Sequence, residues 1–344
     1  MRRLLRALRA LVRSFAGENS AFEKFFRVRY KRLVLRAEHQ TDSSFEQSTR
    51  RVLATTRFRL TNDYTSRNWT VFQRGKSTRR LGIYMLGSCD LPAVFAAKPM
   101  IAARLDGICC IIRDGEVAEA RSDLLLQTLS PIDPALYRLA IQRLRLPADA
   151  FEPRLFQSSF RLRDLPNLGD FPKSVTVLSI GADVSRTLYR HKEHGYLIDP
   201  GGYWLRQNLT NVTANPRRAE WVRENFTSVG TLTADEFKTH FGKVLSILTE
   251  AGTQVVVFNM AVVSPGDLGY SYQFRRNPQA IRRMEFNDAL ADLAGVHGVS
   301  VLNVDRILKR EGIQDQVDFA HFPLERMVPI AREFHRILVD RELV

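Results

Sequence analysis

Cysteine is scarce in this 344-residue chain, and its few cysteines form no recognisable framework. They are Cys89, Cys109 and Cys110, and the last two are adjacent. An odd number of cysteines without the spacing of zinc ligands excludes a disulfide scaffold and a zinc module. The pattern favours a reducing compartment, so we expect a cytoplasmic protein.

Long apolar runs, internal repeats and low-complexity tracts are also missing. No stretch approaches the roughly eighteen apolar residues that a membrane-spanning helix needs. Hydrophobic residues make up 44% of the chain and charged residues 26%, which is ordinary for a globular protein. These absences leave a globular chain that is long enough to bury a sizeable core.

Acidic residues are few at the start of the chain, and this imbalance explains the net charge. Residues 1–36 contain eleven arginines and lysines against two glutamates, so they carry +9 of the net charge of +14. The remaining 308 residues are only weakly basic, and no platform of interleaved aromatic and basic residues accompanies the charge. We therefore expect no nucleic-acid partner.

Residues 1–16 show the spacing of a basic amphipathic helix. Leucines and Phe15 recur at helical intervals, and arginines occupy the intervening positions. Such a helix suits the anionic inner face of a membrane, to which the protein would be peripheral. Packing against its own protein and an organellar transit peptide are the alternatives. Arginines interrupt every apolar stretch that a secretory signal would need.

Strand and helix patterns alternate from residue 80 onward, after a polar segment over 37–79 with one short edge strand near 58–62. The clearest helix covers about 232–251, where Thr233 and Glu236 form a potential capping box and Gly252 ends the pattern. Alternation of this kind predicts parallel βαβ units and an α/β fold, a three-layer α/β/α sandwich with a central parallel sheet. The expected organisation is an N-terminal segment (1–36), a linker with an edge element (37–79) and one domain (80–344).

The stretch Leu86-Gly87-Ser88-Cys89 follows the first apolar strand of this pattern. The carboxyl ends of parallel strands are where open α/β sheets place their chemistry. Gly87 would let the chain turn sharply, which presents a hydroxyl and a thiol side by side. The simpler interpretation is that Gly-Ser only closes a strand.

Near the end of the chain, Asp318 and His321 stand three residues apart, a spacing that brings side chains to one side of a helical turn. An Asp can fix the tautomer of an imidazole whose other nitrogen faces a nucleophile. Together with Ser88 or Cys89, this pair supplies the three roles that acyl transfer needs. A surface histidine is the alternative interpretation.

The order of these segments resembles the SGNH (GDSL-like) hydrolase superfamily, and within it the GSCFA-like branch, whose signature begins Gly-Ser-Cys. The likeness covers about residues 80–344. It includes the strand and Pro-bearing loop at 255–265, the helix with Asn287 and the strand that Asp305 ends, and the D-x-x-H block with the helix after it.

This resemblance implies a flavodoxin-like sheet and an acyl ester hydrolase or O-acyltransferase, with acetyl as the expected acyl group. The substrate would be a carbohydrate or glycolipid, an acyl-CoA could be the donor, and no cofactor or metal is implied. Cys89 aligns with the family's nucleophile, and a shift of one residue would put Ser88 there. The residues expected to line the oxyanion and substrate site are Gly87, Gly181, Asp183 and Asn259.

Asp183 departs from the family pattern, because it occupies the position of an Asn that donates to the oxyanion. An ionised carboxylate only accepts hydrogen bonds. Arg186, Asn208 and Asn259 are the candidate replacement donors. A catalytically inactive module that binds glycans or partners during polysaccharide assembly is therefore the alternative function.

Residues 186–207 concentrate histidine, tyrosine and tryptophan after the strand at 174–181. We expect this irregular segment to lie over the carboxyl edge of the sheet, where its rings could stack on sugars. His191 and His194 have the spacing of metal ligands but no obvious carboxylate or cysteine partner, so we expect no metal site.

Overall fold

The computed structural model separates into two compact units, Met1–Ala54 and Thr55–Val344. The residues that it describes are 53–62, 65–74, 80–87, 91, 94, 108–113, 121–129, 132–144, 146, 151, 173–199, 216–262, 278–311 and 324–344. The predicted basic helix over residues 1–16 lies outside this set. In the described part of the chain, no helix is both long and apolar enough to cross a membrane.

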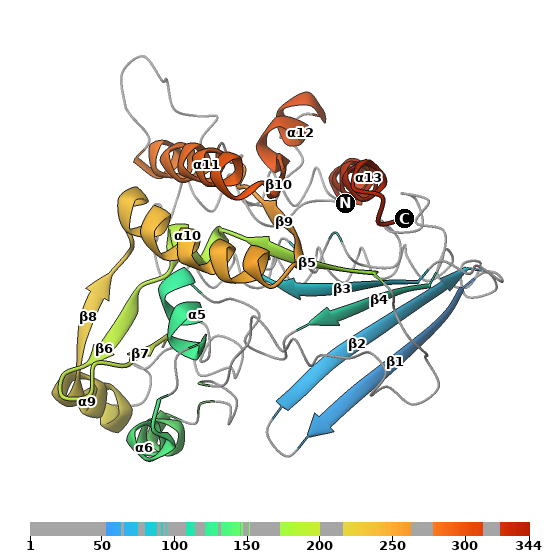
Figure 1. The fold of residues 1–344 in the computed structure, drawn as a ribbon. Coiled ribbons are helices and arrows are strands. Elements are labelled where there is room, and N and C mark those ends of the chain that lie inside the picture. Colours follow the sequence, from blue (N-terminus) through green and yellow to red (C-terminus); the bar gives the residue numbers. More distant parts are fainter. Residues whose placement is uncertain are drawn as a thin grey trace, which may run out of the picture. The chain divides into compact units, whose positions relative to one another are not determined.

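A seven-stranded sheet forms the centre of the second unit (Figure 1). In spatial order its strands are β1 (Leu53–Asn62), β2 (Thr65–Arg74), β4 (Ile108–Arg113), β3 (Arg80–Leu86), β5 (Lys173–Ser179), β9 (Gln254–Phe258) and β10 (Ser300–Leu302). The five strands from β4 to β10 are parallel, and β2 pairs antiparallel with β4.

The order of the five parallel strands confirms the predicted fold class. Counted along the chain from β3, their spatial order is 2-1-3-4-5, the flavodoxin-like arrangement. Its topological switch point lies between β3 and β5, the strands that end at Leu86 and Ser179. The polar 37–79 segment contributes β1 and β2, which extend one edge of the sheet; the sequence had indicated only one short strand there.

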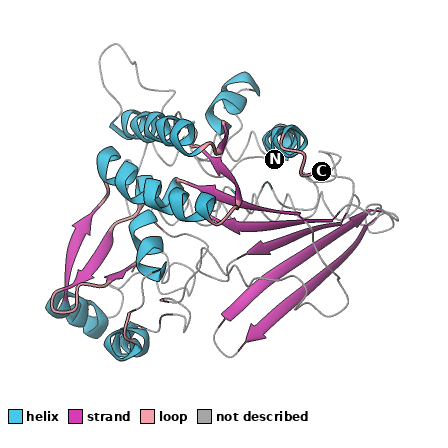
Figure 2. Cartoon of the chain, in the orientation of Figure 1, coloured by secondary structure: helices cyan, strands magenta, loops and turns pink. Residues whose placement is uncertain are grey.

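Helices cover both faces of the sheet, because strands of a parallel sheet must be buried on both sides. The described helices on one face are α5 (Ser122–Leu129), α10 (Ala234–Glu250) and α11 (Pro278–His297), and those on the other are α12 (Val304–Glu311) and α13 (Leu324–Asp340). Alternate residues divide between the two clusters. In β3, Ile83 and Met85 face α13, whereas Leu86 faces α10. Figure 2 shows the same elements coloured by type.

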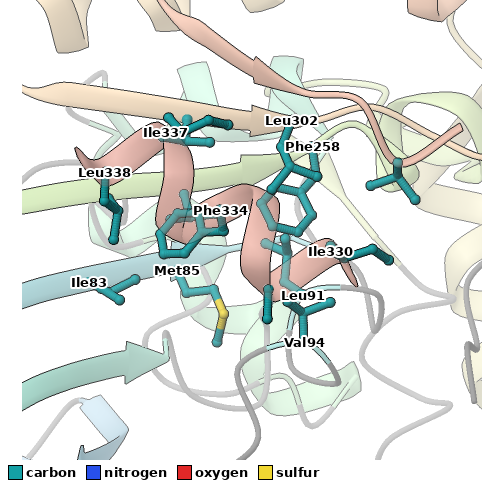
Figure 3. Packing of buried hydrophobic residues seen from close by; sticks show 14 of the residues in the cluster. Ile83, Met85, Leu91, Val94, Phe258, Leu302, Ile330, Phe334, Ile337 and Leu338 are labelled. Atoms are coloured by element: carbon teal, nitrogen blue, oxygen red, sulfur yellow. The ribbon is translucent and has the colours of Figure 1, made fainter. Parts of the chain in front are cut away.

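The direction of α13 is fixed by contacts at its two ends. Just past its last turn, Arg341 donates hydrogen bonds to Ser300 Oγ at 3.0 Å and to Gly298 O at 3.2 Å, beside the start of β10. At the other end, Ile330 packs in one cluster with Leu91, which follows β3 (Figure 3). The helix therefore begins at the carboxyl edge of the sheet and runs towards the amino edge.

The predicted helix near 232–251 is confirmed as α10. Thr233 accepts a hydrogen bond from Glu236 N at 3.2 Å, and Glu236 accepts one from Thr233 N at 2.7 Å, which completes the capping box. One nearby boundary was predicted wrongly. Asp305 does not end a strand but lies in the first turn of α12, after β10 has finished at Leu302.

A second, three-stranded antiparallel sheet occupies part of the segment expected to be irregular. It has the order β7 (Leu197–Ile198), β6 (Leu188–His191), β8 (Phe226–Gly230). Aromatic and aliphatic residues of this sheet pack with helices α6 (Pro134–Leu144) and α9 (Pro216–Asn225). Three short strands separated by turn residues give a weak sequence signal, which is why the sheet was not predicted.

Arg121, whose side chain is only 1% exposed, joins this small sheet to helix α5. Its guanidinium makes two bonds to Asp123, at 2.9 and 2.6 Å. Its Nη1 donates to Arg186 O at 3.0 Å and to Gly230 O at 2.6 Å. One buried cation thus links the start of α5 to the residues before β6 and to the end of β8.

We predict that Arg121→Met destabilises the protein by about 3–5 kcal/mol, because it leaves a largely buried carboxylate and two carbonyls without their donor. Urea unfolding measures the loss. The matched control is Lys238→Met, which removes an equally short ion pair to Asp292 whose partners are both exposed. That change is expected to alter stability by less than about 1 kcal/mol. Equal losses in the two variants would contradict the role given to Arg121.

Candidate functional site

The candidate site lies at the carboxyl edge of the parallel sheet, around the switch point between β3 and β5. Of the residues expected to take part in acyl transfer or to line the oxyanion site, the structure describes Gly87, Gly181, Asp183, Arg186 and Asn259. The predicted nucleophiles Ser88 and Cys89, the pair Asp318 and His321, and Asn208 lie outside the described residues. The site is therefore built here from the ends of the strands.

Gly87 marks where β3 leaves the sheet, and its position has no room for a side chain. A Cβ there would lie 2.5 Å from Ser179 Oγ and 2.6 Å from Leu91 Cδ1. Both distances are shorter than non-bonded atoms tolerate. The glycine therefore allows the chain at the end of β3 to lie directly against Ser179, the last residue of β5.

Asp183 lies in the short helix α7 (Gly181–Ser185), directly after β5, and is fully buried. Its Oδ1 accepts a hydrogen bond of 2.8 Å from Ser122 N, in the first turn of α5. The first amides of a helix have no partner within the helix, so this carboxyl group satisfies one of them. Asp183 thus joins the end of β5 to α5.

Burial raises the pKa of Asp183 to about 7, and hydrogen bonding to Ser122 offsets only part of this effect. The carboxyl group is thus neutral in mildly acidic solution. A protonated carboxyl has an O–H donor, so the premise that Asp183 can only accept hydrogen bonds fails below that pH.

Asn259 follows β9 at the same edge, and its side-chain amide is already engaged. Nδ2 donates to Asn303 Oδ1 at 3.0 Å, and Oδ1 accepts from Asp305 N at 3.3 Å. Both groups belong to the segment after β10. The amide proposed as an oxyanion donor therefore also links the ends of two neighbouring strands.

Side chains from two helices hold the backbone that continues from Asn259. Asn287 of α11 accepts from Met260 N at 3.0 Å and donates to Met260 O at 2.8 Å. Asp305 accepts from Val262 N at 2.8 Å, and Arg283 donates to Val262 O at 2.8 Å. This wall of the site is therefore rigid. The sequence contained Asn287 and Asp305 within a recognised segment, but nothing in it indicated their partners.

His191 is the last residue of β6, and His194 lies in the tight turn that follows it. Their rings stack with centroids 4.7 Å apart, and His191 also stacks on Tyr196. His191 Nδ1 accepts hydrogen bonds from the amides of Glu193 and His194, at 3.3 and 3.1 Å. Burial lowers the pKa of His191, and His194 adds to that effect. The pair stabilises its own turn, and within the described residues no group of three potential ligands surrounds a metal position.

Arg186 forms part of the connection between α7 and β6. Its Nε lies 4.0 Å from Oδ2 of Asp199, whose side chain is buried. Its carbonyl accepts the hydrogen bond from Arg121 described above. The Arg186 guanidinium thus faces the small sheet, where it offsets a buried carboxylate.

Comparison with solved structures gives only distant similarities. They include the acetyl xylan esterase AlAXEase, at 13% identity over 75% of this chain and 99% of that chain, with a TM-score of 0.38. A second is LAE5, an alpha/beta hydrolase enzyme from the Lake Arreo metagenome, at 12% identity over 76% of this chain and 94% of that chain, with a TM-score of 0.35. A third is a mutant of Axe2, an acetyl-xylooligosaccharide esterase from Geobacillus, at 10% identity over 76% of this chain and 94% of that chain, with a TM-score of 0.36.

No protein-family model matches the chain, and no similar curated protein is found. These similarities are too distant to identify the fold, which the order of the parallel strands establishes.

We predict that Gly87→Ala lowers the free energy of unfolding by about 1–3 kcal/mol, because a Cβ would overpack the contact between β3 and β5. Adding Ser179→Ala should recover part of this loss, since it removes the nearest atom but leaves Leu91 in place. Chemical denaturation measures all variants. As a control, Gly295→Ala places a Cβ in open space on α11 and should stabilise the protein by about 0.5–1 kcal/mol. A neutral effect of Gly87→Ala would mean that the turn is not tightly packed.

A second prediction concerns pH. Between pH 4 and 7 the folded protein keeps the Asp183 proton that the unfolded chain releases, so this residue makes wild-type stability fall as the pH rises. Asp183→Asn has no proton to keep, so it lacks this pH dependence of stability. The dependence amounts to about 1.4 kcal/mol in the free energy of unfolding for each unit of pKa shift. The stability of the Asn variant relative to wild type should therefore increase over this range and level off above it. Urea unfolding at several pH values tests this, and parallel profiles would contradict it.

Proposed function

We propose that this protein is an acyl ester hydrolase or O-acyltransferase that acts on a carbohydrate or glycolipid, with acetyl as the acyl group. Cys89 or Ser88 is the nucleophile, His321 is the general base and Asp318 orients the imidazole. The proposal combines the residue pattern with the topology of the sheet.

The direction of α13 is the observation that carries the proposal. The helix starts at Leu324 on the carboxyl edge of the sheet, as the contacts of Arg341 and Ile330 establish. His321 precedes that start by three residues, and Ser88 follows Gly87 at the end of β3. Two chain segments more than 200 residues apart thus meet the described structure at the same edge, where acyl-transfer groups would need to converge.

The chemistry follows from these groups. The nucleophile attacks the ester carbonyl while His321 removes its proton, and backbone amides of the turn after Gly87 stabilise the oxyanion. Collapse of the tetrahedral intermediate breaks the ester bond, and the imidazolium returns the proton to the departing sugar hydroxyl. Water or an acceptor hydroxyl, deprotonated by His321, then attacks the acyl-enzyme, and the nucleophile recovers its proton.

Cys89 has the chemical advantage over Ser88 as nucleophile. A free thiol ionises with a pKa of about 8.5, and a neighbouring imidazolium lowers it further. A hydroxyl needs the general base for any reactivity. An acyl-CoA is the proposed donor for transfer, and residues 1–16 are proposed to bring the protein to an anionic membrane surface where a glycolipid substrate would lie.

One observation favours the alternative of a catalytically inactive, glycan-binding module. Asn259 uses its amide on Asn303, and Asp183 points its carboxyl group at Ser122. Both described candidates for the oxyanion site are thus engaged in structural contacts between strand and helix ends. Loss of one oxyanion donor typically reduces the rate by about 10²–10³-fold.

We expect an activated acetyl ester, 4-nitrophenyl acetate, to leave a covalent acetyl group on the wild-type protein, detectable by mass spectrometry. If Cys89 attacks, Cys89→Ala abolishes this adduct, whereas Ser88→Ala retains it. The reverse pattern identifies Ser88. His321→Ala should slow acylation by at least about 10²-fold, since it removes the general base.

His240→Ala, on α10 and outside the proposed machinery, is the matched control and should acylate at the wild-type rate. If wild type forms no adduct and hydrolyses no ester, yet binds glycans, the enzyme proposal is wrong and the binding module is correct. A wild-type rate in His321→Ala would remove the histidine from the mechanism.

A further inference from the structure

Arg326 occupies the first turn of α13, at the end of the helix that meets the carboxyl edge of the sheet. The side chain is partly exposed, but its Nε is buried from solvent and has no hydrogen-bond partner. Within the described part of the chain, no acidic side chain forms an ion pair with it. A buried donor without a partner is costly in a folded protein, and a bound water molecule or anion is one way to satisfy it.

The position of Arg326 on the helix directs it towards the candidate site. It lies four residues before Ile330 and eight before Phe334, so it continues the row of α13 residues that packs against the sheet (Figure 3). Ile330 is in contact with the cluster that contains Leu91, just beyond the turn at Gly87. Long side chains of a helix lean towards its N-terminus, so we expect the Arg326 guanidinium to extend beyond Ile330, towards the strand ends.

The other arginines of this region have partners or face solvent, which makes Arg326 distinctive. On the same helix, Arg336 pairs with Glu333 and Asp340 at the surface, and Arg332 is exposed. A guanidinium presents its donors in a planar fork that matches the oxygens of a carboxylate or phosphate. The amino end of α13 adds a favourable potential for a negative charge at the same place.

We propose that Arg326 binds an oxyanion group, a carboxylate or a phosphate, on the sugar that enters the candidate site. This inference rests on the proposed function, because it assigns the charge of that function's carbohydrate substrate. It predicts that the protein selects acidic over neutral sugars, with the anion held at the start of α13 and the ester beside the turn after Gly87.

The test measures binding directly, with the full chain and three related probes: glucuronate, glucose 6-phosphate and glucose. Isothermal titration calorimetry should detect one or both anionic sugars with an affinity at least about tenfold higher than for glucose. The sugar that binds more tightly identifies whether the natural group is a carboxylate or a phosphate. Arg326→Gln should weaken that binding by about tenfold or more, and Arg326→Lys should recover part of it because it keeps the charge but not the fork.

Arg332→Gln removes the same charge from an exposed position on α13 and controls for general electrostatic attraction; it should leave the affinity within about twofold of wild type. Equal binding of the anionic sugars by wild type and Arg326→Gln would overturn the inference, as would equal affinity for glucose. Binding that depends on Arg326 in a protein that hydrolyses no ester would instead disprove only the catalytic proposal. A comparison of acetylated glucuronate with acetylated glucose as substrates distinguishes the two proposals further. The wild-type preference for hydrolysing the acidic ester should fall in Arg326→Gln.

Discussion

Burial of both faces of the parallel sheet is the constraint on which the rest of the structure depends. Parallel neighbours cannot be joined by hairpins, so each connection crosses the sheet through a helix and turns at the strand ends. The turns after β3, β5, β9 and β10 consequently gather at one edge. The helices are needed to bury core residues on both faces, such as Ile83 and Phe334 on one and Leu86 and Phe241 on the other. The same packing brings the strand ends together at the edge where a functional site can form.

At that edge, backbone groups that leave the sheet are satisfied by side chains from distant parts of the chain. Asn287 hydrogen-bonds to both the N–H and the carbonyl of Met260, and Asp305 accepts from the N–H of Val262. Asp183 accepts from an N–H in the first turn of α5. These polar contacts fix the strand ends at the positions that packing alone would leave loose. The same buried environment that makes them effective raises the pKa of Asp183, so structural and acid–base properties have one cause.

The features that the sequence predicted correctly are those with a local cause. The capping box of Thr233 and Glu236 and the apolar spacing of α10 need no tertiary information, and the alternation of strands and helices was sufficient for the fold class. Gly87 was singled out because a glycine at the end of a strand has a local steric meaning, and a Cβ there would meet Ser179. Tertiary properties were not predicted: the destination of the Asn259 amide, the pKa of Asp183 and the buried fork of Arg121 depend on partners that no spacing reveals. The small sheet escaped because strands of two to five residues carry too little periodicity.

The two hydrogen bonds from Nη1 of Arg121 have a consequence for how this chain can vary. The carbonyl oxygens of Arg186 and Gly230 both accept from this nitrogen, so the segment that contains the small sheet begins and ends beside the same atom. Holding both ends at one nitrogen fixes where the small sheet leaves and rejoins the main path of the chain. The sheet is also bound between its ends, because Leu188 and Leu197 pack with Leu124 of α5 and Gln127 of α5 bonds to the backbone of Leu197, so its strands and α5 must vary together.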